Sequence, residues 1–519
     1  MPGGGLLALV SYGSQNVILN GNPEFTYFYK VFKRHSHFSI ENTTIALEGP
    51  NELFYDQSIK LRAKIPRIAD LVTDMTLTFD LPDIYSKYLV KNTKRAYQYE
   101  FQWNRYLGAN IINNLSFYVG GTKVQEFDGD YIIIKNHADL DTDTFQKWKY
   151  LVGDIPELTD PQNSFYSGGE RGSSYPTIIP QPNTPQQTNR PSIPSRTINI
   201  PLPLWFSESM KKALPLVALQ YHECEIQITL RPIRELYTIL DPSGYRVRPG
   251  FRVLSSERNI AIGQPEYVTD FDPSGEFRSF LTDFGCETPA LNTWYCNPRI
   301  QASYIYLTES ERKVFAATPL SYLVRQVTAV NTQNIYTRTT IDLEVGNPIT
   351  RLLLLPRRSD SYLYRNQVQN YTNWINPNRA PWLPTVGADN ILNKLTSSGI
   401  IIPNSQDNII NTLRIILDGN EFQEEKPINY YTNIQQYNRI VGGSTQESLY
   451  LPIVNFSLTS SNEQPSGSIN ASRIRSFQLD VNPWALPNQT VYVYDLIVYI
   501  ENINFFVIES GYGGVKYSL

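Results

Sequence analysis

The chain of 519 residues has few cysteines, no long apolar run and no clear signal peptide, which are the features of disulfide-bonded, membrane and secreted proteins. The three cysteines, Cys224, Cys286 and Cys296, are too few and too scattered for a disulfide framework. No uncharged run approaches the ~18 apolar residues that a membrane span requires. The apolar stretch at residues 6–10 lacks the basic flank and the cleavage site of a signal peptide. We therefore expect a soluble protein, made in a reducing cytosol, with buried thiols.

Charge is also scarce, and neither sign prevails. Only 18% of the residues are charged, and the formal net charge is −4. A protein that tracks nucleic acid normally carries a basic excess, so we expect no direct nucleic-acid binding. Asn, Gln, Ser and Thr supply much of the remaining polarity. This composition suits broad surfaces that pack against neighbours, where Lys and Glu would be costly to desolvate.

Aromatic and turn-forming residues are abundant. Aromatic residues make up 13% of the chain and include 35 Tyr, which favours half-buried, pleated surfaces. The 35 Pro and 29 Gly indicate many turns and few long helices. A chain of this length is too long for one hydrophobic core. The composition predicts a large all-β protein of two or three domains.

One short pattern occurs twice in the chain. Residues 113–121 and 411–419 both begin with Asn, alternate into apolar residues and end on Gly. Both continue into a second short strand, at residues 122–127 and 420–423. The Gly-Gly and Asp-Gly-Asn turns are hairpin signals, because they tolerate positive φ. This repeat predicts two similar β domains in tandem.

Loop-rich segments and one predicted helix divide the chain. Residues 1–24 form a Gly-rich arm without a clear period, and residues 155–196 are so rich in Pro, Gln, Asn and Ser that they cannot form a core. The segment from Thr308 to Phe315 is typical of a helix, with Thr308 as N-cap and Glu311 at capping-box spacing. The offset of the repeat places the domain boundary near Pro319.

Several sequence blocks, spread in a fixed order over nearly the whole chain, match a known pattern. The most specific are Ile-Pro-Leu-Pro-Leu-Trp-Phe at residues 200–206, Gln-Tyr-His-Glu at 220–223, and Gln-Pro-Ser-Gly through Ser-Arg-Ile at 464–474. Weaker blocks lie at residues 3–23, 32–35, 304–323, 491–494 and 511–514. With these blocks the chain resembles the major capsid proteins of nucleocytoplasmic large DNA viruses.

This resemblance implies a double jelly roll, that is, two tandem eight-stranded antiparallel sandwiches with long loops and short helices. The corresponding division is an arm at 1–24, a first jelly roll at 25–308, a linker helix at 309–318 and a second jelly roll at 319–519. The resemblance further implies homotrimeric, pseudo-hexameric capsomers that tile an icosahedral shell.

The partners that the resemblance implies are other copies of the chain, neighbouring capsomers, and minor capsid and penton proteins. An inner viral membrane would lie nearby without being spanned. The protein would be made and assembled in the host cytoplasm and reside in the virion. We expect the arm to become ordered only against neighbours, and residues 155–196 and part of 357–408 to face outward.

We expect no catalytic, cofactor-binding or metal-binding residues. Asp139, Asp141 and Asp143 alternate as in a calcium loop, but Thr144 and Tyr150 stand where an EF-hand needs Gly and Glu, so a solvated acidic turn is favoured. His35 and His37 lack partners for a zinc site. Likewise, the Cys residues and His222 lack closed ligand spacing and are expected in buried strands. The pair at residues 357–358 is interpreted as a solvated basic loop or a subunit contact.

Two alternatives stay open at this point. The chain could be a minor or penton-type capsid protein instead of the major one. It could also be a two-domain β-sandwich that binds carbohydrate, with the Trp-bearing segment 374–382 as the binding loop.

Overall fold

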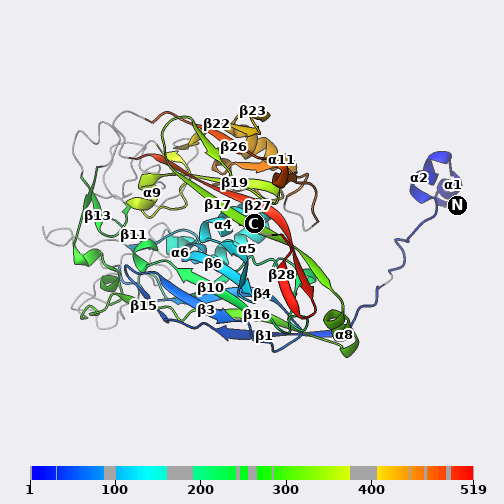
Figure 1. Cartoon of the computed structure of the whole chain (residues 1–519), viewed down its shortest axis with the longest axis horizontal. Coiled ribbons are helices and arrows are strands. Elements are labelled where there is room, and N and C mark those ends of the chain that lie inside the picture. Colours follow the sequence, from blue (N-terminus) through cyan, green and yellow to red (C-terminus); the bar gives the residue numbers. More distant parts are fainter. Residues whose placement is uncertain are drawn as a thin grey trace.

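The computed structural model describes the chain with several gaps. The described residues are 3–30, 32–86, 101–159, 191–240, 246–254, 266–282, 286–374, 406–443, 445, 447–460, 464–486 and 492–517. Most of the loop segments 155–196 and 357–408 therefore lie outside the described residues, and their predicted outward position is not tested. The described part consists mainly of antiparallel sheets that form two bodies, one above the other in Figure 1.

The first body, here called the first barrel, has two main sheets, one of five strands, in which the short β9 (Leu214–Pro215) pairs with β4, and one of four. One has the order β1 (Phe38–Ala46), β16 (Arg299–Leu307), β4 (Leu71–Leu81) and β8 (Arg196–Pro201). The other has the order β3 (Ile59–Lys64), β10 (Cys224–Leu230), β6 (Ile112–Val119) and β7 (Thr122–Phe127). When these eight strands are numbered along the chain, the sheet orders are 1-8-3-6 and 2-7-4-5.

The second barrel repeats this topology. One sheet has the order β17 (Leu320–Ile335), β27 (Tyr494–Glu509), β19 (Pro348–Arg358) and β24 (Ile453–Asn455). The other has the order β18 (Thr339–Asp342), β26 (Phe477–Pro483), β22 (Ile410–Leu417) and β23 (Asn420–Pro427). Numbered along the chain, these strands again give 1-8-3-6 and 2-7-4-5. The predicted pair of eight-stranded jelly rolls is confirmed.

The two hairpins predicted from the repeat occupy the same place in their barrels and share one register. Val119 pairs with Thr122 and Phe117 with Gln125 in the first, just as Leu417 pairs with Asn420 and Ile415 with Gln423 in the second. A bulge interrupts both ladders at the same step, and a second bulge in the later hairpin, between Leu413 and Ile415, changes its register farther from the turn. The turns use positive φ, at Gly120 and Gly121 and at Asp418 and Gly419. The repeat is therefore structural.

Helices fill the long connections. Between β7 and β8 lie α4 (Gly129–Asp139), α5 (Thr142–Val152) and α6 (Pro156–Thr159); between β23 and β24 lie a π-helical turn, η7 (Tyr430–Ile434), and α11 (Gln435–Arg439). The other helices are α1 (Gly4–Val10), α2 (Ser14–Asn20), α3 (Leu107–Asn110), α8 (Glu309–Ala317) and α9 (Ser359–Leu363).

Shorter elements complete the described fold. The further strands are β2 (Glu52–Phe54), β5 (Phe101–Trp103), β9 (Leu214–Pro215), β11 (Tyr237–Leu240), β12 (Arg246–Val247), β13 (Phe251–Leu254), β14 (Glu266–Thr269), β15 (Thr293–Tyr295), β20 (Asn373–Trp374), β21 (Gln406–Asp407), β25 (Ile469–Asn470) and β28 (Tyr512–Val515). The 3-10 turns are η2 (Met210–Lys212), η3 (Ile233–Glu235), η4 (Pro273–Gly275), η5 (Phe277–Phe280), η8 (Glu447–Tyr450) and η9 (Ala471–Arg473).

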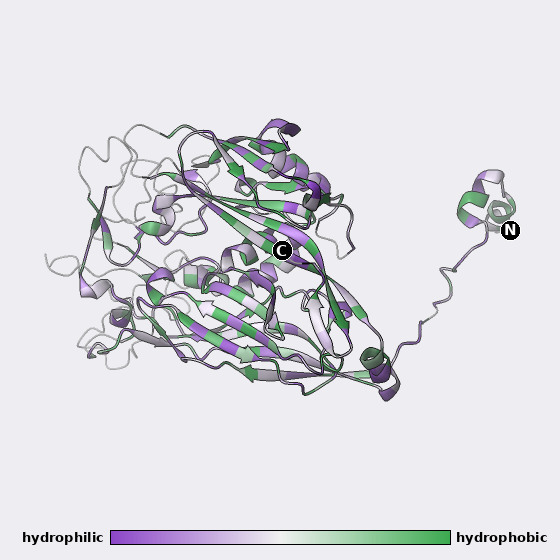
Figure 2. Cartoon of the chain, in the orientation of Figure 1, coloured by the Kyte–Doolittle hydropathy of each residue, from purple (hydrophilic) through white to green (hydrophobic). Residues whose placement is uncertain are grey.

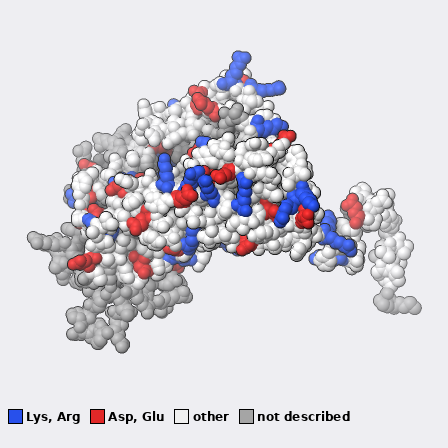
Figure 3. All heavy atoms as spheres, turned by 60° about the horizontal axis from the view of Figure 1, so that its bottom comes forward, with Lys and Arg blue, Asp and Glu red and all other residues white. Residues whose placement is uncertain are grey.

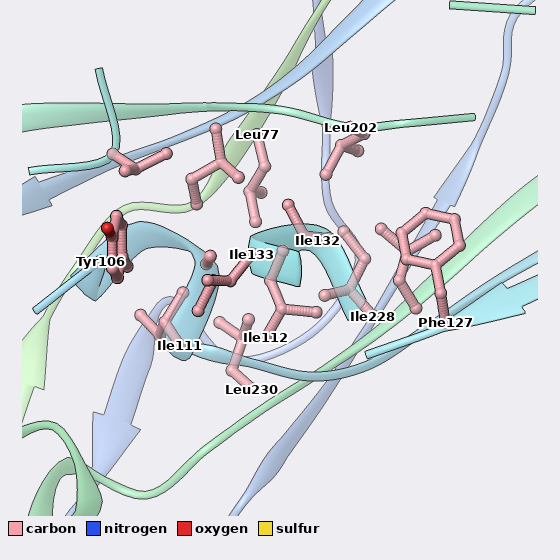
Figure 4. Packing of buried hydrophobic residues seen from close by; sticks show 14 of the residues in the cluster. Leu77, Tyr106, Ile111, Ile112, Phe127, Ile132, Ile133, Leu202, Ile228 and Leu230 are labelled. Atoms are coloured by element: carbon pink, nitrogen blue, oxygen red, sulfur yellow. The ribbon is translucent and has the colours of Figure 1, made fainter. Parts of the chain in front are cut away.

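Alternation along the strands places the core. In β3 the residues Ile59, Leu61 and Ala63 are buried and their neighbours are exposed, and this banding recurs across the sheets in Figure 2. The first barrel's core also takes in α4, whose Ile132 and Ile133 pack among residues of β6 and β10 (Figure 4). A helix is thus inserted beside the first sandwich, on the side that faces the second barrel.

One local prediction needs correction. Thr308 is the N-cap of α8, as expected, but its side chain makes no capping hydrogen bond, so the capping box is not formed. The arm contains the short helices α1 and α2, which extend away from both barrels in Figure 1. The first strand, β1, begins at Phe38, well after residue 25.

Candidate functional site: the seam between the two barrels

The two barrels meet along a contact that we call the seam. It joins α4 and β7 of the first barrel to β17, β19 and β27 of the second. The sequence begins α4 directly after β7, because Asp128 caps the helix by accepting a hydrogen bond from the backbone N–H of Tyr131 (2.8 Å). Gly129 lets the helix start close to α3, since a Cβ there would overlap the carbonyl oxygen of Ala109. Most of α4 is consequently buried.

A buried arginine lies at the centre of the seam. Arg351 of β19 is fully buried and binds two carboxylates at once, Glu501 of β27 and Asp139 of α4. Its Nε and Nη2 donate to Glu501 at 2.8 and 2.9 Å, while Nη1 and Nη2 donate to Asp139 at 2.6 and 3.0 Å. Tyr131 adds a hydrogen bond to Glu501 (2.9 Å), and Lys135 pairs with Asp139 (3.0 Å).

Each charge in this cluster is compensated by another. Burial alone would raise the pKa of Asp139, but the positive charges of Arg351 and Lys135 outweigh it and hold the pKa below its usual range. The two bidentate pairs hold the guanidinium group of Arg351 in one orientation. Because Asp139 comes from the first barrel and Glu501 from the second, Arg351 fixes the position of one barrel relative to the other.

A second group of charges surrounds the start of α4. Arg357 of β19 forms an ion pair with Asp130 (2.6 Å), and Tyr499 of β27 donates to both carboxylate oxygens of Asp128 (2.9 and 2.8 Å). Beside them is a cavity of about 400 Å³, which Arg231 also lines. Burial and the nearby charge of Asp130 raise the pKa of Asp128 to about 6.

Glutamines join the two edge strands at the seam. Gln125 of β7 donates to the carbonyl of Arg325 (3.0 Å), and Gln326 of β17 donates to the carbonyl of Val124 (2.7 Å). Both β7 and β17 are edge strands of their sheets, so their outer carbonyls need partners. The reciprocal amides satisfy these carbonyls without merging the two sheets into one.

The end of α4 is held by the second barrel's β23–β24 connection. The N–H groups of Gly442 and Gly443 donate to the carbonyls of Ala138 (2.9 Å) and His137 (2.7 Å). The Nδ1 of His137 is hydrogen-bonded to Thr445 Oγ1 at 2.8 Å. The last carbonyls of the helix are thereby satisfied by the other barrel.

His137 is the titratable group of the seam that bears most directly on pH dependence. Its ring packs against the rings of Tyr106 and Phe145. Burial lowers its pKa to about 4, although the charges of Glu447 and Asp154 oppose this and those of Arg105 and Lys149 add to it. His137 is therefore neutral in the folded protein near neutral pH.

The structure places several predicted residues differently from expectation. Asp139 is not in a solvated turn, because its side chain is only 10% exposed and pairs with Arg351, while Asp141 and Asp143 are exposed at the start of α5. The basic pair at residues 357–358 is buried in β19 and is not a solvated loop. These residues are charged because they pair across or beside the seam.

The cysteines and histidines also differ in part from the prediction. Cys224 and Cys296 are buried, but Cys286 is exposed. His222 is half-buried in a loop, where its ring is hydrogen-bonded to the backbone of Gly513. Among the described residues, no three His, Cys, Asp or Glu side chains gather as metal ligands would. No helix in the described ranges is both long and apolar enough to cross a bilayer.

The comparisons with known proteins agree with this architecture. Residues 26–254 match the family model of the major capsid protein N-terminus, and residues 311–514 match that of the large eukaryotic DNA virus major capsid protein. Together the matches span most of the chain. The chain belongs to the major capsid protein family of large eukaryotic DNA viruses.

Relatives and a solved structure support the assignment. The major capsid protein of Phaeocystis pouchetii virus is 23% identical, over 99% of both chains. Capsid protein 1 of Acanthamoeba polyphaga mimivirus is 31% identical over 46% of this chain, which spans only 36% of that relative's length. A structure of PBCV-1 VP54 has a TM-score of 0.64 at 19% identity and covers 95% of this chain and 100% of its own, which shows the shared fold. The chain is thus a structural protein of the viral capsid, not an enzyme.

We expect Arg351→Met to destabilise the protein by about 3–5 kcal/mol, because Glu501 would stay buried without its cation and Asp139 would keep only Lys135. Urea unfolding at fixed protein concentration measures the change. Lys313→Met is the matched control, since Lys313 pairs with Glu309 on the exposed face of α8 and should have no measurable effect. If Arg351→Met and Lys313→Met had the same free energy of unfolding, the inference that Arg351 holds the seam together would be refuted.

We expect acidification to weaken the seam through His137. Its folded pKa, about 4, lies below the unfolded value of 6.5, so its contribution is present above pH 6.5 and is lost as the pH falls toward 4. Asp128 acts in the opposite sense, since its raised pKa adds stability below pH 6.

Comparison of the wild type with His137→Gln isolates the histidine. The free-energy difference between the two should change by about 2 kcal/mol in favour of the variant from pH 7 to pH 4.5. If the free energies of unfolding of the two proteins changed with pH in parallel, His137 would not be held neutral in the folded protein.

Proposed function

We propose that the chain is the major capsid subunit, and that three copies form a pseudo-hexameric capsomer that tiles an icosahedral shell. The observation that carries this proposal is that one chain contains two barrels of identical strand order, fixed together by a buried charged seam. Three such chains supply six similar barrels. The names of the matched relatives as major capsid proteins favour this role over a minor or penton-type one.

The surface composition supports assembly rather than binding of nucleic acid. Charged side chains of both signs are interspersed among uncharged ones on the face shown in Figure 3. Such a surface offers no basic track for a phosphate backbone. The carbohydrate-binding alternative has no support from the family matches, and most of its Trp-bearing segment, 374–382, lies outside the described residues.

We further propose that the arm, residues 1–24, binds neighbouring subunits or minor capsid proteins. Its helices bury none of their residues, and Leu7, Leu9 and Ile18 are 75, 78 and 85% exposed. Apolar side chains this exposed favour burial against a partner. The arm leaves the body beside α8, where Ser36 donates a hydrogen bond to Glu311 (3.3 Å).

The remaining assignments follow from the same family role. We propose neighbouring capsomers and penton proteins as partners, an inner membrane nearby, and synthesis and assembly in the host cytoplasm. We also propose a division of the chain into an arm (1–24), a first barrel (25–308), a linker helix (309–318) and a second barrel (319–519). Its support is the position of α8 between the last strand of one barrel and the first strand of the next.

The trimer is tested by the mass in solution. Light scattering of the purified protein at micromolar concentration should give three times the 59.4 kDa of one chain. Obligate contacts of this kind bury more than ~2,000 Å² in total, so the trimer should persist on dilution. A stable monomer, with no particles in electron micrographs, would contradict the proposal.

Deletion of residues 2–20 tests the arm. The truncated protein should keep its melting temperature and its trimer, because the deleted helices contact neither barrel core. Shell assembly, scored by electron microscopy after co-expression with the minor proteins, should fail. A large fall in melting temperature would instead show that the arm belongs to a barrel.

A further inference from the structure

The seam joins two unlike faces. The first barrel contributes its β7 edge and the helices of the β7–β8 connection, and the second contributes the sheet that contains β17, β27 and β19. Because both barrels have the same topology, each carries one face of each kind. The seam uses one of each. Two faces are not used by the seam. In the second barrel it is the β23 edge with η7 and α11, at the top of Figure 1, and in the first barrel it is the β1–β16–β4–β8 sheet, at the bottom.

The two hairpins allow a residue-by-residue comparison. By their shared register, Phe422 corresponds to Val124, and Gln423 to Gln125. Val124 and Gln125 are buried at the seam, with 1 and 4% exposure, whereas Phe422 is 53% exposed. A bulky aromatic side chain thus stands uncovered at the position that, in the first barrel, is covered by the second.

The helix beside this edge is also uncovered. Tyr437 of α11 is 90% exposed, and Ile434 and Val441 on either side of it are 53 and 54% exposed. The one charged residue of α11, Arg439, is half-buried and donates toward the carbonyls of residues 455 and 457. An aromatic and aliphatic patch without exposed charge has the composition of an interface core.

The complementary face lies on β1. Ile45 points into the first barrel, so by alternation Ile40, Asn42 and Thr44 point outward, and all three are exposed. In sheet position β1 is the counterpart of β17, because each is the edge strand that pairs with the last strand of its barrel. It presents small polar and apolar side chains, as a partner edge requires.

We propose that Phe422, Gln423 and the exposed face of α11 dock on the β1 edge of a second copy of the chain, and so repeat the seam between subunits. The contact is heterologous, because each copy offers one face and receives the other. A heterologous contact generates a ring when its repeated rotation closes, as the proposed trimer requires, and an open filament when it does not. This inference rests on the proposed trimer and names the surfaces that form it.

Three matched substitutions test the surfaces. Phe422→Lys and Ile40→Lys each place a charge on one of the two faces, while Phe271→Lys places the same charge at an exposed aromatic residue outside both. Tyr437→Lys repeats the test on α11, where 90% exposure leaves the fold undisturbed. Light scattering measures the mass, and circular dichroism with thermal melting checks that each variant is folded.

We expect the wild type and Phe271→Lys to be trimers, and the other three variants to be folded monomers. A trimeric wild type with trimeric Phe422→Lys, Ile40→Lys and Tyr437→Lys would overturn the surfaces and leave the proposed capsomer intact. A monomeric wild type would overturn the capsomer itself, and the docking with it.

Discussion

The arrangement of the molecule depends on one buried guanidinium. Arg351 has no exposed surface and is held by two carboxylates, one from each barrel. A buried ion pair adds little net stability compared with apolar packing, but it is costly to separate. It therefore acts on geometry: any rotation of one barrel against the other would separate Asp139 from Arg351 and break the hydrogen bond from Tyr131 to Glu501. We infer that specificity of orientation is the reason for a charged seam in a protein so poor in charge.

Elsewhere along the seam, polar groups of one barrel are satisfied by hydrogen bonds from the other barrel. The reciprocal glutamines Gln125 and Gln326 satisfy edge carbonyls, and Gly442 and Gly443 satisfy the end of α4. Every one of these bonds needs both barrels in place. For a shell subunit this matters, because a flexible hinge between barrels would transmit an error in angle to every neighbour. Rigidity at the seam would let the two barrels of one chain act as two units of the proposed capsomer.

Much of the fold could be predicted from local sequence, because hairpins are specified by their turns. The repeat at residues 113–121 and 411–419 predicted the duplication, and its offset holds for the strand pairs next to the two turns. Helix α5 could have been found from Phe145, Trp148 and Val152, which recur at helical spacing. Helix α4 gave a weaker signal, because its run of three Ile resembles a strand.

The seam itself was not predictable from one sequence. Arg351 and Asp139 are more than two hundred residues apart, and no spacing rule connects them. The sequence therefore predicts solvated charges at these positions, although Arg357 and Arg358 are buried and the side chain of Asp139 is only 10% exposed. Only the folded topology brings them together.

The central claim is that the seam makes the two barrels one cooperative unit. Calorimetric unfolding of the full chain tests it most directly, with the ratio of van't Hoff to calorimetric enthalpy as the readout. A single transition, in which both barrels unfold together, is the expected result. Two separate transitions, one for each barrel, would show that the barrels are independent domains and would contradict the claim.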